Sequence, residues 1–469
     1  MPVACPGSSA SCPFVAVAAA GAGYGGSAPG CNPGVNRGRG RRGTPLVFQW
    51  LTTGIPVRSM IAKRAVPARR HRGARRPMKI DPASALPFPR AEHEERQARL
   101  RARLREAGVD AMLVFAQESH YWLTGYDTGG YVFFQCAVVT ADERPIVLLT
   151  RRPDLYQARV TSTIEDIRIW WDAEDADPAV DLRGILEELG LKGSRIAVEL
   201  NTHGLTGWNL WRVQRALEGF CTLENDDHLI RRLRLIKSPA EIEYTRKAGE
   251  ILDRSLDAVI AAAKPGVLDS EIKAEYLRSI LADGADMPPN APLFNSGPRA
   301  IYGRGVSEPR RIEAQDQILV EYPVAYRRYN VKTEWTILFG KPDPRQVRMY
   351  DAARATLEKM TEIARPGTTL GEIFDAHAEG LDSAGFQAAR YGATGYSVGC
   401  TFAPTSMDVP PMIYHGNPTV CEPGMTLFYH VMMGDAETGF GMGVGHTLLV
   451  TEGAPEVLTG LPDALTVVT

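Results

Sequence analysis

Short apolar runs alternate with amphipathic segments from residue 79 onward, and this alternation predicts an α/β protein. Residues 90–108 carry apolar side chains at helical spacing and end at Gly108, whereas 111–116 form a short continuous apolar run typical of a buried strand. These elements predict an α/β domain over residues 79–230. Its further strands are expected at 131–140, 145–150, 164–171 and 195–200, and its further helices at 183–190 and 209–219.

A strong helix start follows this domain, and we expect the second domain to span residues 231–469. The sequence SPAE at 238–241 matches a capping box with proline at the first helical position. The helix that it starts is expected to end at the KPG turn, 264–266, with another helix after it. The same order of helix, turn and helix recurs around RPG at 365–367, which predicts a duplicated unit of helices and strands.

The first 78 residues differ from the rest in composition. They contain twelve Lys or Arg residues, no Asp or Glu, and much Gly, Ala and Pro, which is typical of a disordered segment. Two interpretations stand for residues 1–78: a targeting segment or nucleic-acid-binding arm, or an upstream extension of a chain that starts at Met60 or Met78. The absence of a clean apolar stretch with a cleavage site favours the second.

The composition of the whole chain is that of a globular protein. Hydrophobic residues make up 44% and charged residues 23% of the 469 positions, and no apolar run reaches the roughly 18 residues that span a bilayer. The seven cysteines show no metal-like spacing, which favours free thiols in a reducing compartment. We therefore expect a cytoplasmic protein, with neither nucleic acid nor membrane as partner.

Charged residues interrupt the most strand-like stretch of the second domain. Residues 320–340 have the pattern of a β-hairpin with a basic turn, yet Glu321 stands in the first strand and Lys332 and Glu334 in the second. Charges that face a core are costly unless they are paired or put to use. A structural interpretation pairs Glu321 with Lys332 and Glu334 with a turn arginine. A functional interpretation makes this hairpin the floor of a catalytic site.

Several motifs together resemble the pita-bread family, which includes methionine aminopeptidase, aminopeptidase P, prolidase, creatinase and ectoine hydrolase. The resemblance covers residues 79–469. It implies a small creatinase/prolidase-like N-terminal α/β domain followed by an α+β pita-bread catalytic domain. The motifs are RLIKSPAEIEYTRKAG (234–249), the paired KPG and RPG turns, CEPGMTLFYHV (421–431) and HTLLVTEGAPEVLT (446–459).

The peptidases of this family hold two metal ions with two Asp, one His and two Glu. At the corresponding positions this chain has Glu321, Lys332, Tyr396, His430 and Gly445. An ammonium group and a phenol do not replace the anionic and imidazole ligands of a dication. The comparison with the family's ligand set therefore implies a site without a metal or another cofactor.

Two metal-free members resemble this sequence better. Creatinase has a second-strand Glu that corresponds to Glu334 and a His that corresponds to His446, while its other catalytic His is matched by Arg304. Ectoine hydrolase has a hairpin Glu, implicated as a nucleophile on a cyclic amidine, that corresponds to Glu321, and a loop similar to TGYSVG at 394–399. Both resemblances imply hydrolysis of a C–N bond that is not a peptide bond.

We therefore expect a metal-independent hydrolase of a small cyclic amidine or guanidine-like substrate. The expected catalytic residues are Glu321, Glu334, His430 and His446, and the expected substrate-binding residues are Arg304, Lys332, Trp335, Tyr396 and Phe402. Two other functions stay open: a metallopeptidase for Xaa-Pro bonds and a catalytically inactive binding module. Either histidine also has a structural interpretation, as a core residue or at a strand end.

A homodimer is expected as well. In creatinase-like proteins the N-terminal domain of one chain borders the active site of the other. The aromatic stretch HYWLTGYDTGGYVFF at 120–134 is larger than a domain of this size needs for its core. Because exposed aromatic side chains commonly mark interfaces, we expect this stretch to supply that border.

Overall fold

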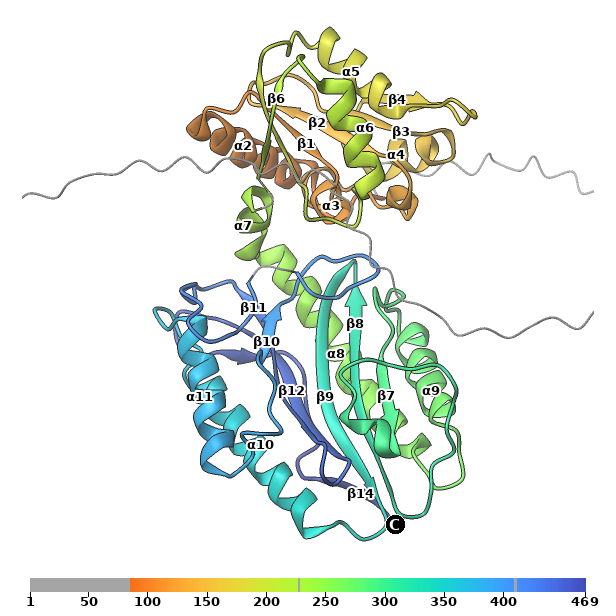
Figure 1. Ribbon diagram of the computed structural model, residues 1–469, viewed down its shortest axis with the longest axis vertical. Helices are drawn as coiled ribbons and strands as arrows, with labels where there is room; N and C mark the ends of the chain where they lie inside the picture. Colours follow the sequence, from red (N-terminus) through yellow and green to blue (C-terminus); the bar gives the residue numbers. More distant parts are fainter. Residues whose placement is uncertain (1–84, 227, 409–410) are drawn as a thin grey trace, which may run out of the picture. The chain divides into compact units, whose positions relative to one another are not determined.

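The computed structural model describes residues 85–226, 228–408 and 411–469, which belong to one unit, Arg76–Thr469. The basic segment 1–78 and both interpretations of it lie outside the described residues. Two sheets of different topology carry the fold (Figure 1). In the described part of the chain, no helix is both long and apolar enough to cross a membrane.

The first sheet has the α/β arrangement that the sequence predicts for the N-terminal domain. Its order is β4-β3-β2-β1-β5-β6, with β2 antiparallel to both neighbours and the other pairs parallel. The strands are β1 (Ala111–Val114), β2 (Cys136–Thr140), β3 (Val147–Arg151), β4 (Asp166–Trp170), β5 (Arg195–Val198) and β6 (Thr222–Asn225). The helices are α2 (Arg90–Ala107), α3 (Gln117–Thr124), α4 (Leu155–Thr161), α5 (Pro178–Glu188) and α6 (Gly207–Leu217). The run expected as a strand at 131–140 starts as a 3-10 turn and is extended only over β2.

The second sheet forms the floor of the C-terminal domain, in the order β10-β11-β12-β9-β8-β7; in addition, β13 pairs with β12 and β14 pairs with β9. Its strands are β7 (Leu293–Ser296), β8 (Asp316–Tyr326), β9 (Tyr329–Phe339), β10 (Gly395–Ser397), β11 (Thr426–Asp435), β12 (Phe440–Leu449), β13 (Glu456–Val457) and β14 (Thr466–Val468). The helices are α7 (Leu229–Leu235), α8 (Pro239–Ala262), α9 (Asp269–Ala282), α10 (Pro344–Glu362) and α11 (Leu370–Ser383).

The duplicated pattern in the sequence corresponds to two helix pairs that cover one face of this sheet. The capping box at Ser238 starts α8 with both of its hydrogen bonds formed, and Thr369 starts α11 in the same way. The apolar sides of α8 and α9 pack with β8 and β9, whereas those of α10 and α11 pack with β11 and β12. Burial of these apolar stripes leaves the opposite face of the sheet free to carry polar groups.

Most aromatic rings of the stretch at 120–134 are buried, and Phe133, which is 47% exposed, is the exception. Tyr121, Trp122, Tyr126 and Phe134 are at most 3% exposed and belong to the interior. The hydroxyl of Tyr121 donates to the Arg327 carbonyl oxygen at 2.9 Å. Most of these rings therefore serve the interior of one chain, Phe133 is left at the surface, and the homodimer stays a prediction.

The β8–β9 hairpin turns through two arginines in the left-handed region. Arg327 has φ 50° and Arg328 has φ 68°, the signature of a tight type I′ turn. Asp127 pairs with the Arg328 guanidinium at 2.8 Å, and Asp286 accepts from the Arg328 backbone N–H at 2.8 Å. The side chain of Arg327 is exposed. The strain at Arg327 is therefore not offset by side-chain contacts in the way that it is at Arg328.

Substitution of Arg327 tests this turn. Asn tolerates positive φ, so Arg327→Asn should stabilise the protein by up to about 1 kcal/mol. The β-branched Arg327→Val should destabilise it by about 1–2 kcal/mol. Thermal unfolding of both variants beside the parent measures the difference. Equal midpoints for Asn and Val at this position would contradict the turn.

Candidate active site

Alternation along the strands places the predicted polar residues on one face. Glu321 of β8 lies directly opposite Glu334 of β9, and Lys332 stands two residues before Glu334. Because successive strand residues point to opposite faces, all three side chains leave the sheet on the side away from the helices. Tyr396 of β10 and His430 of β11 join them, and we call these five residues the polar cluster.

Lys332 connects the centre of the polar cluster. Its ammonium group donates to a carboxylate oxygen of Glu321, and to the hydroxyl of Tyr396 at 2.6 Å. Burial disfavours the charge of Glu321, but the Lys332 ammonium and its other cationic neighbours outweigh this and hold the pKa of Glu321 below its usual value. Burial raises the pKa of Tyr396 to about 12, against the opposing effect of Lys332. Glu321 is thus a carboxylate and Tyr396 a phenol at neutral pH.

Glu334 is a buried carboxyl group without a hydrogen-bond partner among the described residues. Its side chain is 0% exposed, and it fits because β12 has Gly443 beside it: a Cβ there would lie 2.1 Å from Glu334 Oε1. Burial, reinforced by the nearby Glu321 carboxylate, raises the pKa of Glu334 well above its usual value. Glu334 is therefore a neutral acid, and it does not pair with a turn arginine as one interpretation of the sequence proposed.

His430 lies between Glu334 and the solvent side of the cluster. Its Nδ1 is 3.9 Å from Glu334 Oε2, and its side chain is 16% exposed. Burial lowers the pKa of His430 to about 4; Glu321 opposes this shift and Lys332 adds to it. The imidazole is therefore neutral near pH 7 and able to accept a proton.

These groups open into a cavity of about 770 Å³, a volume suited to a small molecule. Glu321, Lys332, Tyr396 and His430 line it together with Arg304, so five of the nine expected site residues meet there. Glu334 lies beneath His430. The remaining wall comes from the segments 290–293, 303–306, 391–393 and 404–407 and from Lys273, Met412 and Met432.

Two expected site residues lie on the wrong face of the sheet. His446 follows Gly445 on β12, and its Nε2 is 2.9 Å from the Thr361 hydroxyl of α10. Trp335 follows Glu334 on β9 and packs edge-on against Tyr322 among the helices. The expectation of a role in the cavity was wrong for both, because a shift of one residue along a strand reverses the side to which a side chain points.

Phe402 is not a wall of the cavity either. Its ring packs against Tyr121 and Tyr131 of the N-terminal domain, with ring centroids 5.7 and 6.1 Å apart. The Arg328 guanidinium lies 4.8 Å from the centre of the same ring. Phe402 therefore anchors the loop that follows β10 rather than contacting a substrate.

Sequence reasoning missed part of the cavity. Lys273 of α9 and Asn290 line it, yet neither belongs to a motif, and a helix lysine usually marks a solvated surface. The signal that was present is the alternation Gly441, Gly443, Gly445 on β12, which leaves one face of that strand without side chains. Such a bare strand indicates that other groups approach it closely.

The residues present do not fit a two-metal centre. Among the described residues, no group of three or more His, Cys, Asp or Glu side chains is arranged to hold a metal ion. The ammonium group of Lys332, which binds Glu321 and Tyr396, takes the central place instead. Glu321 is the only carboxylate that the described residues contribute to the cavity lining, and a fixed positive charge beside it repels a dication.

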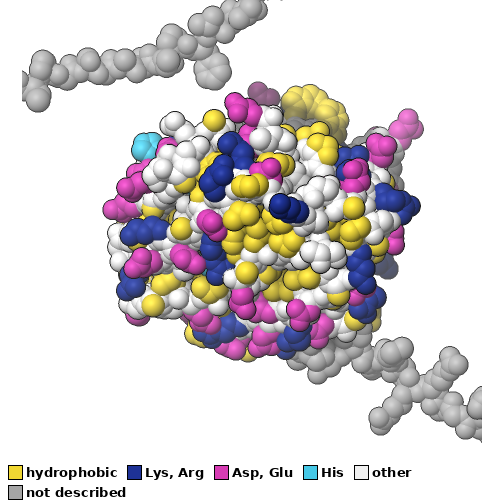
Figure 2. Space-filling model, turned by 90° about the horizontal axis from the view of Figure 1, so that it is seen from below, with side chains coloured by type: hydrophobic (Ala, Val, Ile, Leu, Met, Phe, Trp, Pro, Cys, Tyr) yellow, Lys and Arg dark blue, Asp and Glu magenta, His cyan; other side chains and the backbone are white. Residues whose placement is uncertain are grey.

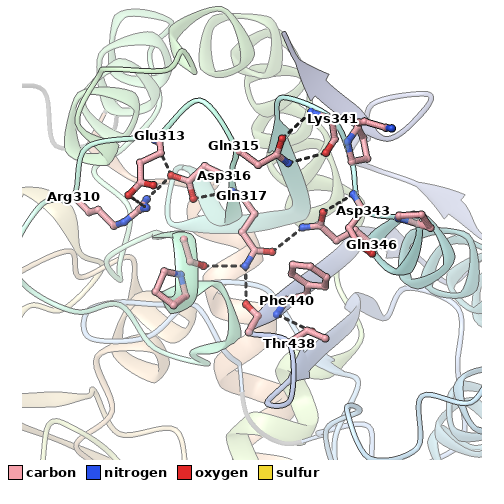
Figure 3. A pocket seen from close by; sticks show the side chains of 15 residues that line it. Arg310, Glu313, Gln315, Asp316, Gln317, Lys341, Asp343, Gln346, Thr438 and Phe440 are labelled. Carbon is pink, nitrogen blue, oxygen red and sulfur yellow. Dashed lines mark hydrogen bonds and ion pairs between the residues drawn. The ribbon is translucent and has the colours of Figure 1, made fainter.

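A second cavity of about 790 Å³ lies near the ends of β8 and β9 that are farthest from the turn (Figure 3). Its polar side chains mostly bind each other: Arg310 pairs with Glu313 at 2.8 Å, and Gln317 accepts from Gln346 at 3.2 Å. Figure 2 shows the molecule from the end where the C-terminus lies, with acidic and basic side chains intermixed.

Comparisons with known proteins agree with the two-domain fold. The creatinase/prolidase N-terminal domain matches residues 96–236, and metallopeptidase family M24 matches residues 243–452. Ectoine hydrolase of Halomonas elongata is 26% identical over 398 residues, which cover 81% of this chain and 98% of that protein. The Xaa-Pro dipeptidase of Pyrococcus furiosus is 29% identical over 235 residues, 50% of this chain and 65% of that protein.

A solved structure shows the same fold. The dipeptidase PepE from Mycobacterium ulcerans superposes with a TM-score of 0.71 over 81% of this chain and 99% of its own, at 22% identity. The matched domains occur in the same order as the two sheets described above. This chain therefore belongs to the hydrolases of metallopeptidase family M24, with a creatinase/prolidase N-terminal domain ahead of its pita-bread domain.

Proposed function

We propose that this chain hydrolyses a C–N bond other than a peptide bond in a small cyclic amidine or guanidine-like substrate, without a metal ion. The observation that carries the proposal is the Lys332 ammonium at the centre of the polar cluster, bound to Glu321 and Tyr396. It keeps Glu321 ionised and takes the place that a peptidase of this family gives to metal ligands. The match to an ectoine hydrolase over nearly its full length supports the same reaction class.

In the proposed reaction Glu321 is the attacking group or the base. Its carboxylate adds to the electrophilic amidine carbon or activates a water for that addition. The C–N bond of the ring then breaks. One water is consumed overall: its oxygen becomes the carbonyl oxygen of the product amide, and both of its protons end on substrate nitrogen.

His430 moves the proton in this scheme. As a neutral imidazole it accepts a proton from the attacking water and passes it to the leaving nitrogen. Glu334 Oε2 lies 3.9 Å from His430 Nδ1, so the Nδ1 side of the imidazole ring faces the Glu334 carboxyl group. Tyr396 accepts a hydrogen bond from Lys332, so its own proton is free to donate to the substrate.

An Xaa-Pro peptidase is the second candidate, because Xaa-Pro dipeptidases match half of this chain. That activity would need metal ligands that the cavity does not provide. A catalytically inactive binding module would keep the fold without turnover. The cytoplasmic location, the homodimer and the absence of nucleic acid and membrane partners belong to the same proposal.

Replacement of Glu321 tests the proposed chemistry. Glu321→Gln keeps the shape of the side chain but removes its charge, so turnover of a cyclic amidine should fall by about two orders of magnitude or more. The substrates to assay are ectoine, creatine and Xaa-Pro dipeptides, each with and without a chelator. Loss of wild-type activity with chelator, or full activity of Glu321→Gln, would contradict the metal-free mechanism.

The two histidines provide a matched pair for the same assay. His430→Asn should slow turnover strongly, whereas His446→Asn should not, because His446 points to α10 and away from the cavity. Circular dichroism of both variants verifies that they fold.

The pH profile of kcat/KM should reflect the lowered pKa values. Glu321 must be ionised and His430 neutral: the pKa of Glu321 is held below its usual value, and His430 stays neutral until the pH falls to about 4. Activity should therefore be flat from about pH 6 to 8 and should decline on the acid side as the pH approaches 4. An inflection near pH 6.5, where an ordinary histidine titrates, would contradict these assignments.

The buried acid makes a prediction about stability. The pKa of Glu334 is higher in the folded than in the unfolded state, so folding binds a proton. The stability that this proton contributes is complete below the unfolded pKa of about 4.3 and declines as the pH rises toward the folded value. Glu334→Gln should thus gain stability relative to the parent between pH 5 and pH 8, measured by urea unfolding. A difference that does not change with pH would show that Glu334 is ionised.

A further inference from the structure

A smaller cavity, of about 190 Å³, lies at the carboxyl ends of β1 and β5, which are parallel neighbours in the first sheet. Its lining comes from the start of α3, from the segment 200–203 after β5, from α7 and from the loop that follows β10. The chain leaves β1 toward β2 on one side and leaves β5 toward β6 on the other, so the cavity lies where the order of the strands reverses. Such points are preferred ligand sites of α/β sheets.

Two arginines of α7 line this cavity, and each retains an unpartnered donor. Arg234 is only 3% exposed, and Arg231 lies one turn before it. The Nη1 of Arg231 and the Nε of Arg234 are buried and have no hydrogen-bond acceptor among the described residues. The start of α3 adds further donors, because its N-cap residue Ala116 has no side chain that could cap the first N–H groups of the helix. Buried donors without acceptors are costly, so the cavity favours a ligand rich in acceptor oxygens.

Three acids at or beside this cavity are held by donors of the protein. Asp408 accepts from Arg234 at 2.7 Å and lies 4.0 Å from the Lys237 ammonium. Glu118 accepts from a backbone N–H at 3.4 Å. Glu199, the residue before the lining segment, accepts from two backbone N–H groups and a hydroxyl, and burial raises its pKa. An added cation would compete with the cations already bound to Asp408, whereas an oxyanion would accept from the N–H groups that the two arginines have left.

The loop after β10 belongs to this cavity and to the 770 Å³ cavity of the polar cluster. Thr405 and Met407 line both of them. Arg234 holds the loop at two points, because its Nη2 donates to the Cys400 carbonyl oxygen at 2.9 Å and to Asp408 at 2.7 Å. A ligand bound to Arg234 in the smaller cavity would therefore touch residues that also shape the larger one.

We propose that the 190 Å³ cavity is an effector site for a small oxyanion, which binds Arg231 and Arg234 and holds the loop residues 404–408 in place. The planar guanidinium fork of arginine matches the oxygens of phosphate and carboxylate groups. The volume is several times the ~30 Å³ that one water occupies in the liquid, and it lies below the ~300 Å³ at which pockets for drug-sized ligands begin. The ligand is thus of the size of phosphate or a short carboxylate. This site is separate from the polar cluster and does not depend on the proposed hydrolysis.

Calorimetric titration of the full-length protein with inorganic phosphate tests the site. In a chloride buffer of constant ionic strength, binding should saturate at one phosphate per chain. Sulfate and acetate, titrated in the same way, identify the ligand geometry: tighter binding of phosphate or sulfate indicates a tetrahedral oxyanion, and tighter binding of acetate indicates a carboxylate. Absence of saturable binding for all three anions would overturn the site.

Variants of α7 identify the residues responsible. Arg231→Gln should weaken binding of the anion about tenfold or more, as expected for the loss of a charge-assisted hydrogen bond. Arg231→Lys, which keeps the charge but not the planar fork, should weaken it less. Arg232→Gln changes an exposed arginine of the same helix that does not line the cavity, so it should leave the affinity unchanged. Equal affinity of Arg231→Gln and the parent protein would place the anion elsewhere and overturn the site.

Hydrogen exchange measured by mass spectrometry tests the effect on the loop. With the anion at saturation, the peptide that covers residues 400–408 should exchange more slowly in the parent protein and in Arg232→Gln, because the bound anion adds contacts to this loop. At the same anion concentration, Arg231→Gln should show less protection. Unchanged exchange of this peptide in the saturated parent protein would overturn the role as an effector site.

Discussion

The site is organised by one buried cation, the ammonium group of Lys332. It lies where two strands and a third edge strand bring Glu321 and Tyr396 together, and it donates a hydrogen bond to each. A buried ammonium is costly without partners, so the three groups hold each other in place. The charge of Glu321, the donor direction of Tyr396 and the incompatibility with a dication all follow from this position.

The second constraint is the room that β12 gives to Glu334. Alternate glycines remove the side chains from one face of that strand, and the carboxyl group fills the space that a Cβ at Gly443 would occupy. A carboxyl group sealed there has no water to stabilise its charge, so it stays protonated. Two glutamates directly opposite each other on neighbouring strands thus differ in charge. The difference arises because Lys332 bonds to one of them and not to the other.

The N-terminal domain supports the same hairpin at its turn and at the first residue of β9. Tyr121 and Asp127 bind the backbone and the guanidinium of the two turn arginines. At the start of β9, the Tyr329 hydroxyl donates to Glu241 at 2.7 Å, and Arg96 of α2 lies 3.3 Å from the same carboxylate. Glu241 also closes the capping box of α8. A single acidic residue therefore joins a helix start, the β8–β9 hairpin and the N-terminal domain.

Local signals in the sequence determined most of the fold. The capping box at Ser238, the turn at Arg327 and Arg328 and the two-fold order of helices depend on neighbouring residues, and each appears where the pattern predicts it. The motifs that resemble the pita-bread family determined the types of both domains, because each motif also consists of neighbouring residues along the chain. The hairpin charges were taken as a site candidate because charge inside an apolar strand needs an explanation, and Glu321 and Lys332 do line a cavity.

Tertiary structure alone decided which of these side chains meet. His446 and Trp335 each stand one position along the strand from a residue on the cavity side of the sheet. The side to which a strand residue points depends on the register of its strand with distant strands. The burial of Glu334 depends on a glycine more than a hundred positions away, and one wall of the cavity includes Lys273, from a helix with no motif. Sequence patterns describe neighbours along the chain, whereas burial and charge balance depend on neighbours in space. Only the packing of the sheet determined which residues are neighbours in space.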